Sequence, residues 1–70
     1  MIHPRRIWRK SIGATLAAVA AEVGVSEGLV QRWEVGTRVP TALMDASWLS
    51  ALRRLELRSR ESVSRLRGEL

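Results

Sequence analysis

Apolar residues recur three and four positions apart along most of the chain, which is the spacing of amphipathic helices. The spacing predicts helices over residues 4–12, 16–23 and 27–35, and a fourth helix that begins after Thr41. The residues that carry it are, in chain order, Ile7, Trp8 and Ile12, then Ala17, Val19, Ala20 and Val23, then Leu29, Val30 and Trp33, then Leu43, Trp48, Leu49 and Leu52. We therefore predict an all-α protein with Trp33 in its core.

Residues with known end preferences mark the limits of these helices. Pro4 suits a first helical turn, where its missing N–H is not needed. Hydroxyl side chains that can accept hydrogen bonds from the free N–H groups of a helix start precede the other three helices, at Thr15, Ser26 and Thr41. Gly24 and Gly36 follow the second and third helices, and glycine enters the left-handed conformation that ends a helix at low cost.

The second and third helices are joined by a short turn that begins with Gly24. Val25 is apolar and can close the corner, and Ser26 can cap the next helix. Two short helices joined by such a turn form a helix-turn-helix unit, whose second helix can enter the major groove of DNA. The stretch from Thr15 to Pro40 therefore predicts a DNA-binding unit.

The order of residues in this stretch resembles the phage Cro/repressor family of DNA-binding domains, often called XRE-like. The resemblance covers about residues 5–53 and is carried by Ala20, Gly24, Val25, Ser26, Val30, Arg32, Trp33, Glu34, Gly36 and Pro40. It implies a compact domain of four to five helices. We divide the chain into this domain at 1–53 and a helical segment for dimerisation at 54–70. The chain departs from the family's apolar pattern at Arg5, and it has Leu16 where many relatives carry a Gln that grips a phosphate.

The third helix is the expected recognition helix. At 3.6 residues per turn, Glu27, Gly28 and Gln31 share the face opposite the apolar stripe, with Arg32 on its flank. Arg can bond a guanine edge in two places, Gln an adenine, and Glu can accept from cytosine. We predict that these four residues read bases. In an alternative, Arg32 grips phosphate while Glu27 and Gln31 read the bases. Gly28 either allows close approach of the DNA or is merely tolerated.

Five residues around this helix are the expected phosphate contacts, namely Arg9, Thr15, Ser26, Thr37 and Arg38. Arg38 is the strongest of them, because the loop after the third helix lies beside the DNA backbone in the family. Leu16 has no polar group for a phosphate, so Thr15 and nearby backbone N–H groups would bind it instead.

The resemblance also implies an ion pair between the first and third helices. It makes Arg9 the partner of Glu34, and it leaves Arg9 able to face a phosphate. The alternative is that both side chains are solvated and unpaired. We expect the basic residues of the first helix on its outer side: Arg5, Arg6, Arg9 and Lys10.

The C-terminal segment carries a second helical pattern. Alternating steps of three and four relate Leu52, Leu55, Ser59, Ser62, Leu66 and Glu69, which is the spacing of a coiled-coil seam. The segment contains no proline, so a helix that continues from the fourth is slightly favoured. The alternative is a break near Arg58 and Ser59, followed by a fifth helix. In either case we expect dimerisation through Leu55, Val63 and Leu66.

Composition narrows the partners. The chain carries twelve Lys or Arg against seven Asp or Glu, for a net charge of +5, and eleven of the twelve are Arg. This balance suits a polyanion, and Arg suits phosphate geometry. With no cysteine and one isolated histidine, His3, we expect no metal, no cofactor and no enzyme activity. The Ala-rich run after Arg5–Arg6 is too weakly apolar for an export signal, and no run is long enough for a membrane span.

These observations predict a small homodimeric transcriptional regulator that binds a palindromic or pseudo-palindromic double-stranded DNA operator. We expect it to act in the bacterial cytoplasm, at the nucleoid, as a repressor or autoregulator of a phage, plasmid or other mobile element, without a small-molecule ligand. Two alternatives stay open. The chain could bind another protein through its C-terminal helix, as an antitoxin or antiactivator does, or it could bend DNA as an accessory factor for recombination.

Overall fold

The computed structural model describes residues 2–68, apart from the Arg67 side chain, and every element in that range is a helix. The elements are α1 (Pro4–Ser11), α2 (Leu16–Val23), α3 (Glu27–Val35) and α4 (Ala42–Gly68). The all-α prediction is confirmed, and the first three helices lie within a residue of their predicted bounds.

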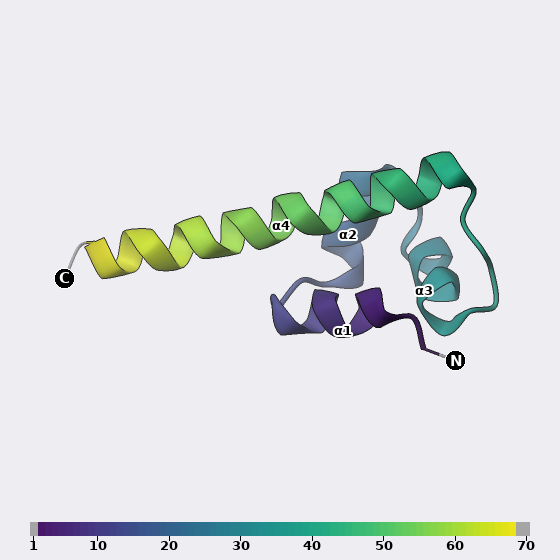
Figure 1. The fold of residues 1–70 in the computed structure, drawn as a ribbon, viewed down its shortest axis with the longest axis horizontal. Helices are drawn as coiled ribbons and strands as arrows, with labels where there is room; N and C mark the ends of the chain where they lie inside the picture. Colours follow the sequence, from purple (N-terminus) through teal and green to yellow (C-terminus); the bar gives the residue numbers. More distant parts are fainter. Residues whose placement is uncertain (1, 69–70) are drawn as a thin grey trace.

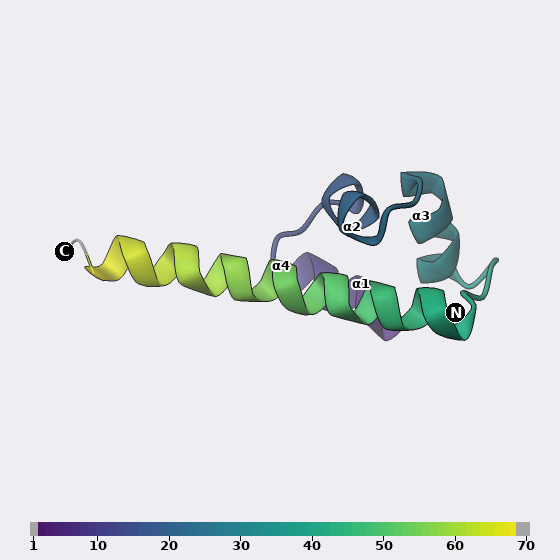
Figure 2. The same cartoon turned by 90° about the horizontal axis from the view of Figure 1, so that it is seen from above.

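The three short helices gather against the first half of α4, and the second half of α4 projects beyond them (Figure 1). Turned by 90°, α2 and α3 lie together on one side of α4 (Figure 2). The core forms where α2, α3 and α4 meet, and its buried residues are Val19, Ala20, Val30, Trp33, Trp48 and Leu52. Trp8 and Ile12 close it from the side of α1. The predicted burial of Trp33 is confirmed.

The predicted helix ends are confirmed. The Thr15 hydroxyl accepts from the N–H of Ala18 at 3.0 Å, and the Ser26 and Thr41 hydroxyls accept in the same way at the starts of α3 and α4. Gly24 and Gly36 end α2 and α3 with φ of 86° and 83°. An L-residue with a Cβ would be strained at those angles, which is why glycine sits there.

Helix α4 runs without a break for 27 residues, so the alternative of a separate fifth helix after Ser59 is wrong. Contacts with the globule also pass the boundary predicted at residue 53. Leu55 packs against the core, and Glu22 of α2 accepts from both Arg54 and Arg58. Within residues 2–68, no helix combines the length and the apolar composition that crossing a membrane requires.

Three apolar positions were assigned to the wrong face, namely Ile7, Ala17 and Leu43. Ala17 is exposed on α2, whose buried positions are Val19 and Ala20. Ile7 is 69% exposed, because the inward positions of α1 are occupied by Arg5, Trp8 and Arg9. Leu43 is 74% exposed, because it lies in the first turn of α4, where Met44 rather than Leu43 packs against the core. The expectation that Arg5 and Arg9 point outward is wrong for the same reason.

Candidate nucleic-acid interface

Helix α3 has one face in the core and one face in solvent. Val30, Trp33 and Glu34 are buried, and the four predicted base-reading residues, Glu27, Gly28, Gln31 and Arg32, are all exposed. Ser26 caps the start of this helix, and Gly36 ends it. The apolar stripe therefore presents the four residues together, along one side of a short, capped helix.

The polar groups on this face are not used inside the protein. Among the described residues, the side chains of Glu27, Gln31 and Arg32 make no hydrogen bond and no ion pair. A Cβ added at Gly28 would meet no atom within 4 Å, so the backbone is open to solvent there. This face can therefore donate to and accept from an external ligand without giving up an internal hydrogen bond.

Arg9 is held inside the protein by Glu34. Its Nε donates to Glu34 Oε2 at 2.7 Å and its Nη2 donates to Oε1 at 3.1 Å, while Nη1 donates to the carbonyl of Ala14 at 2.9 Å. Arg9 is 8% exposed and Glu34 is 2% exposed. The predicted pairing is confirmed, and the alternative of two solvated side chains is wrong. The same geometry argues against the phosphate contact expected of Arg9, since all three nitrogens already donate to the protein.

The other predicted phosphate contacts lie at the surface around α3. Thr15 and Ser26 use a hydroxyl oxygen for capping, so the hydroxyl proton stays available as a donor. Thr37 and Arg38 follow the end of α3. The Thr37 hydroxyl donates to the carbonyl of Arg32 at 3.4 Å, which argues against the phosphate contact expected of it, whereas Arg38 is exposed and makes no ion pair with the described residues. Donors thus stand near both ends of the exposed face, and such donors are the groups that contact a phosphate backbone.

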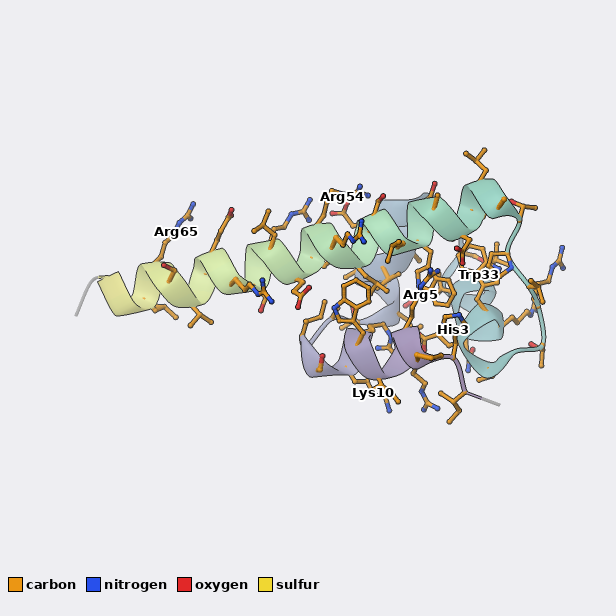
Figure 3. All side chains as sticks on the ribbon, in the orientation of Figure 1. His3, Arg5, Lys10, Trp33, Arg54 and Arg65 are labelled. Atoms are coloured by element: carbon orange, nitrogen blue, oxygen red, sulfur yellow. The ribbon has the colours of Figure 1, made fainter. Side chains whose placement is uncertain are left out.

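A cluster around Trp48 was missed by the sequence reasoning. His3, Arg5 and Trp33 surround this tryptophan, between α1, α3 and α4, while Lys10 lies on the outer side of α1 (Figure 3). Arg5 also forms an ion pair with Asp45, Nη1 to Oδ1, at 2.6 Å. The signal in the sequence was the spacing of Arg5 with Trp8, at the point where the chain departs from the family pattern.

Some of the cationic side chains form ion pairs inside the protein and others do not. The hydrogen bond from Arg5 lowers the pKa of Asp45, and hydrogen bonds from Arg58 and Arg54 lower the pKa of Glu22. Asp45 balances the charge of Arg5, whereas Arg54 and Arg58 share the single negative charge of Glu22. Among the described residues, the cationic side chains without such a partner are Arg6, Lys10, Arg32, Arg38, Arg53 and Arg65.

No family model matches the chain, and no curated protein or solved structure does either. The resemblance to the Cro/repressor family therefore stays a prediction from the residues quoted for it.

Proposed function

We propose that the protein is a sequence-specific DNA-binding regulator in which α2 and α3 act as a helix-turn-helix. One observation carries the proposal. The face of α3 that bears Glu27, Gly28, Gln31 and Arg32 is exposed, and its side chains make no hydrogen bond or ion pair with the described residues, while the opposite face is buried in the core. A short helix with a rigid base and an unused polar face suits the major groove, where each base pair offers a distinct pattern of donors and acceptors.

The roles on this face follow from its chemistry. Arg32 donates in two directions and suits a guanine edge, and Gln31 suits an adenine. Gly28 leaves the backbone uncovered, so that α3 can enter the groove closely. Arg38 beyond the C-terminal end of α3, with the hydroxyls of Ser26 and Thr15, would hold the phosphates and set the register. Glu27 would repel phosphate, so it must face bases or a neighbouring arginine.

The decisive experiment is selection of duplexes from a random library by the purified full chain, followed by affinity measurements across salt concentrations. We expect an enriched motif and a linear fall of log affinity with log salt, with a slope of about −0.9 for each phosphate neutralised. A chain that enriches no motif and binds with no salt dependence would refute DNA recognition. Tight capture of one protein in its place would favour the protein-binding alternative.

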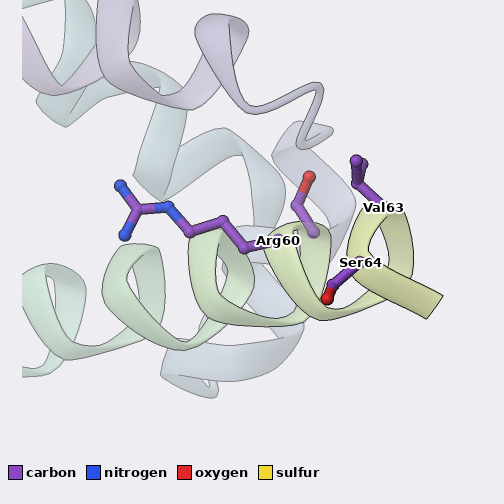
Figure 4. A pocket seen from close by; sticks show the side chains of 4 residues that line it. Arg60, Val63 and Ser64 are labelled. Carbon is purple, nitrogen blue, oxygen red and sulfur yellow. The ribbon is translucent and has the colours of Figure 1, made fainter. Parts of the chain in front are cut away.

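We further propose that the regulator works as a homodimer through the projecting half of α4. The face of α4 that packs on the globule continues past it as Ser59, Ser62, Val63 and Leu66, which we call the tail stripe. Val63 is 46% exposed and Leu66 is 65% exposed, and a shallow hollow opens beside Val63, between Ser59, Arg60 and Ser64 (Figure 4). Leu55, which was also predicted to take part in dimerisation, does not belong to this surface, because it packs against the core of its own chain.

The tail stripe suits a second copy because it holds no charge. Among the described side chains of this half, Arg60 borders the stripe at the hollow beside Val63 and is paired with Glu56, and Arg58 is paired with Glu22. A two-fold dimer would place two α3 helices on the two half-sites of a palindromic operator.

The dimer is tested by sedimentation of three variants of the full chain. Val63→Glu and Leu66→Glu put charge on the tail stripe, and we expect monomers that bind only half-sites. Leu57→Glu is the control, because Leu57 is exposed but lies more than about 100° around the helix from both residues. If the two stripe variants sediment as the wild-type dimer does, the interface lies elsewhere. If the wild-type chain sediments as a monomer, the proposal of a homodimer is wrong.

A further inference from the structure

The N-terminal residues cross from α1 to both α3 and α4. The backbone N–H of His3 donates to the carbonyl of Glu34 at 2.7 Å, and the His3 ring lies 4.8 Å from the Trp48 ring. Arg5 places its guanidinium carbon 4.8 Å from the centre of the same ring. We call His3–Arg5 the N-terminal strap, since it ties the end of α3 to the first turns of α4.

The strap is completed by an ion pair with α4. Arg5 Nη1 and Nη2 donate to the two carboxylate oxygens of Asp45 at 2.6 and 3.3 Å, and Nη1 also reaches the Asp45 carbonyl at 3.4 Å. A guanidinium that meets a carboxylate with two nitrogens is fixed in orientation as well as in position. The planar group then covers the Trp48 ring, an arrangement in which cation and aromatic face attract each other.

The strap acts on one end of α3. The other end is capped by Ser26 and joined to α2 by a short turn, so it is held independently. At the C-terminal end, Glu34 is fixed through its carbonyl by His3 and through its carboxylate by Arg9. The Trp33 ring lies 5.4 Å from the Trp48 ring at a tilt of 40°, and His3 and Arg5 of the strap contact that same Trp48 ring. The exposed Arg32 directly precedes these two anchored residues.

We infer that His3 and Arg5 are positioning residues for the reading helix: they set the tilt of α3, and so the placement of Arg32, without touching DNA. The inference rests on the proposed function. A recognition element must be held within about 0.5 Å and 10–20° of its working geometry by its supporting residues. Arg5 cannot serve as a phosphate contact in this arrangement, because its side chain is 17% exposed and both terminal nitrogens are on Asp45.

The test compares Arg5→Gln with Arg6→Gln in the full chain, on the selected operator and on random duplex. The two variants change the net charge equally, and Arg6 makes no ion pair with the described residues. We expect Arg5→Gln to lose specific affinity by on the order of fivefold or more, relative to Arg6→Gln. Affinity for random duplex should differ between the two variants by less than about twofold, and the salt slope should not fall by the ~0.9 that each neutralised phosphate contributes.

A second variant covers the case in which Arg5→Gln folds poorly. Asp45→Asn breaks the same ion pair from a half-exposed carboxylate on α4, and it should lose operator preference in the same way. Because the two residues act through one contact, the double variant should lose no more specific affinity than the worse single variant. All affinities are measured at a temperature where melting curves show each variant folded.

The outcomes separate this inference from the proposed function. If the wild type selects no operator, both the proposed function and this inference are wrong. A wild type that binds its operator, with folded Arg5→Gln and Asp45→Asn variants that match its preference, removes the inference alone. Equal losses on operator and random duplex with a lower salt slope would make Arg5 a phosphate contact, and would also overturn the inference.

Discussion

Arg9 and Glu34 lie 25 positions apart in the sequence and form a buried, two-pronged ion pair that joins α1 to α3. Both side chains are nearly inaccessible, and the third donor of Arg9 meets the carbonyl of Ala14. Removing two charges from water is costly, and the cost is offset only when both partners are present and their hydrogen bonds are complete. The pair therefore makes the orientation of α3 depend on α1.

Breaking this pair from one side should be strongly destabilising. Glu34→Gln keeps the shape of the side chain but leaves the Arg9 charge buried without a counterion, and we expect a loss of about 3–5 kcal/mol in the free energy of unfolding. Urea titration followed by circular dichroism measures it. Glu27→Gln, on the exposed face of the same helix, is the control and should change stability by less than about 0.5 kcal/mol. If both variants unfold at the wild-type midpoint, the Arg9–Glu34 ion pair does not contribute to the stability of the fold.

Trp33→Ala should act through folding rather than through recognition. The side chain is buried against Trp48, and truncation of a buried Trp costs on the order of 3–5 kcal/mol, a large share of the stability of so small a chain. Thermal melting should show the loss, and Val35→Ala, at an exposed position on α3, should melt close to wild type. Normal melting of Trp33→Ala together with a loss of DNA binding would place Trp33 in the interface instead.

Gly28→Ala should separate stability from DNA binding. The added Cβ meets no neighbour, and alanine favours the helix over glycine by about 1 kcal/mol, so the variant should be more stable than wild type. If α3 approaches the DNA through this bare backbone, operator affinity should fall despite the gain. Melting curves and operator titrations on the same sample measure both quantities. Unchanged affinity would mean that glycine is simply tolerated there.

Arg32 and Arg38 should differ in what they recognise. Both are exposed and without an ion-pair partner among the described residues, but Arg32 lies on the face of α3 and Arg38 lies in the loop after it. Arg32→Ala should flatten the preference at one base pair in each half-site, by about 1–3 kcal/mol. Arg38→Ala should weaken all sequences about equally. Titration against operators changed one pair at a time decides the matter, and a uniform loss for Arg32→Ala would assign it to phosphate.

Acid should weaken the protein partly through Asp45. The hydrogen bond from Arg5 lowers the pKa of this carboxyl in the folded chain, so the folded state favours the ionised form. Such a group contributes stability that is fully present above its unfolded pKa and is lost as the pH falls through the lower folded pKa. Stability should therefore hold from neutral pH to about pH 4 and decline below it. The contribution is modest because the Asp45 side chain is 46% exposed.

Asp45→Asn isolates this contribution. The variant should be less stable than wild type at neutral pH, and the difference should close as the pH falls through the lowered pKa of folded Asp45, below which the wild-type carboxyl is protonated too. Glu61→Gln is the control, since Glu61 is exposed and makes no ion pair with the described residues. Melting temperatures from pH 7 to pH 2 give the comparison. A difference that stays constant over this range would show that the pair with Arg5 does not stabilise the fold.

Local sequence features were enough to place most of the helices and their ends. The hydroxyls of Thr15, Ser26 and Thr41 and the glycines at 24 and 36 act on the backbone within a few residues, so their effect can be predicted without knowing the fold. The exposed face of α3 followed from helical periodicity in the same way, because its buried side was clearly apolar. Whether that face reads DNA stays a prediction.

Only the tertiary structure decided which charged side chains are buried and that Arg5 pairs with Asp45, whereas the family resemblance had already indicated Glu34 as the partner of Arg9. Periodicity assigns an arginine to the surface, because burial of a lone charge is unfavourable, yet Arg5 and Arg9 turn inward. They do so because Asp45 and Glu34 arrive from α4 and α3 to meet them. Ile7 is left outside for the same reason, since the inward positions of α1 are already taken. The unbroken course of α4 was likewise undecided by sequence, because the segment after Leu55 holds no residue that must stop a helix and little apolar surface that must continue one.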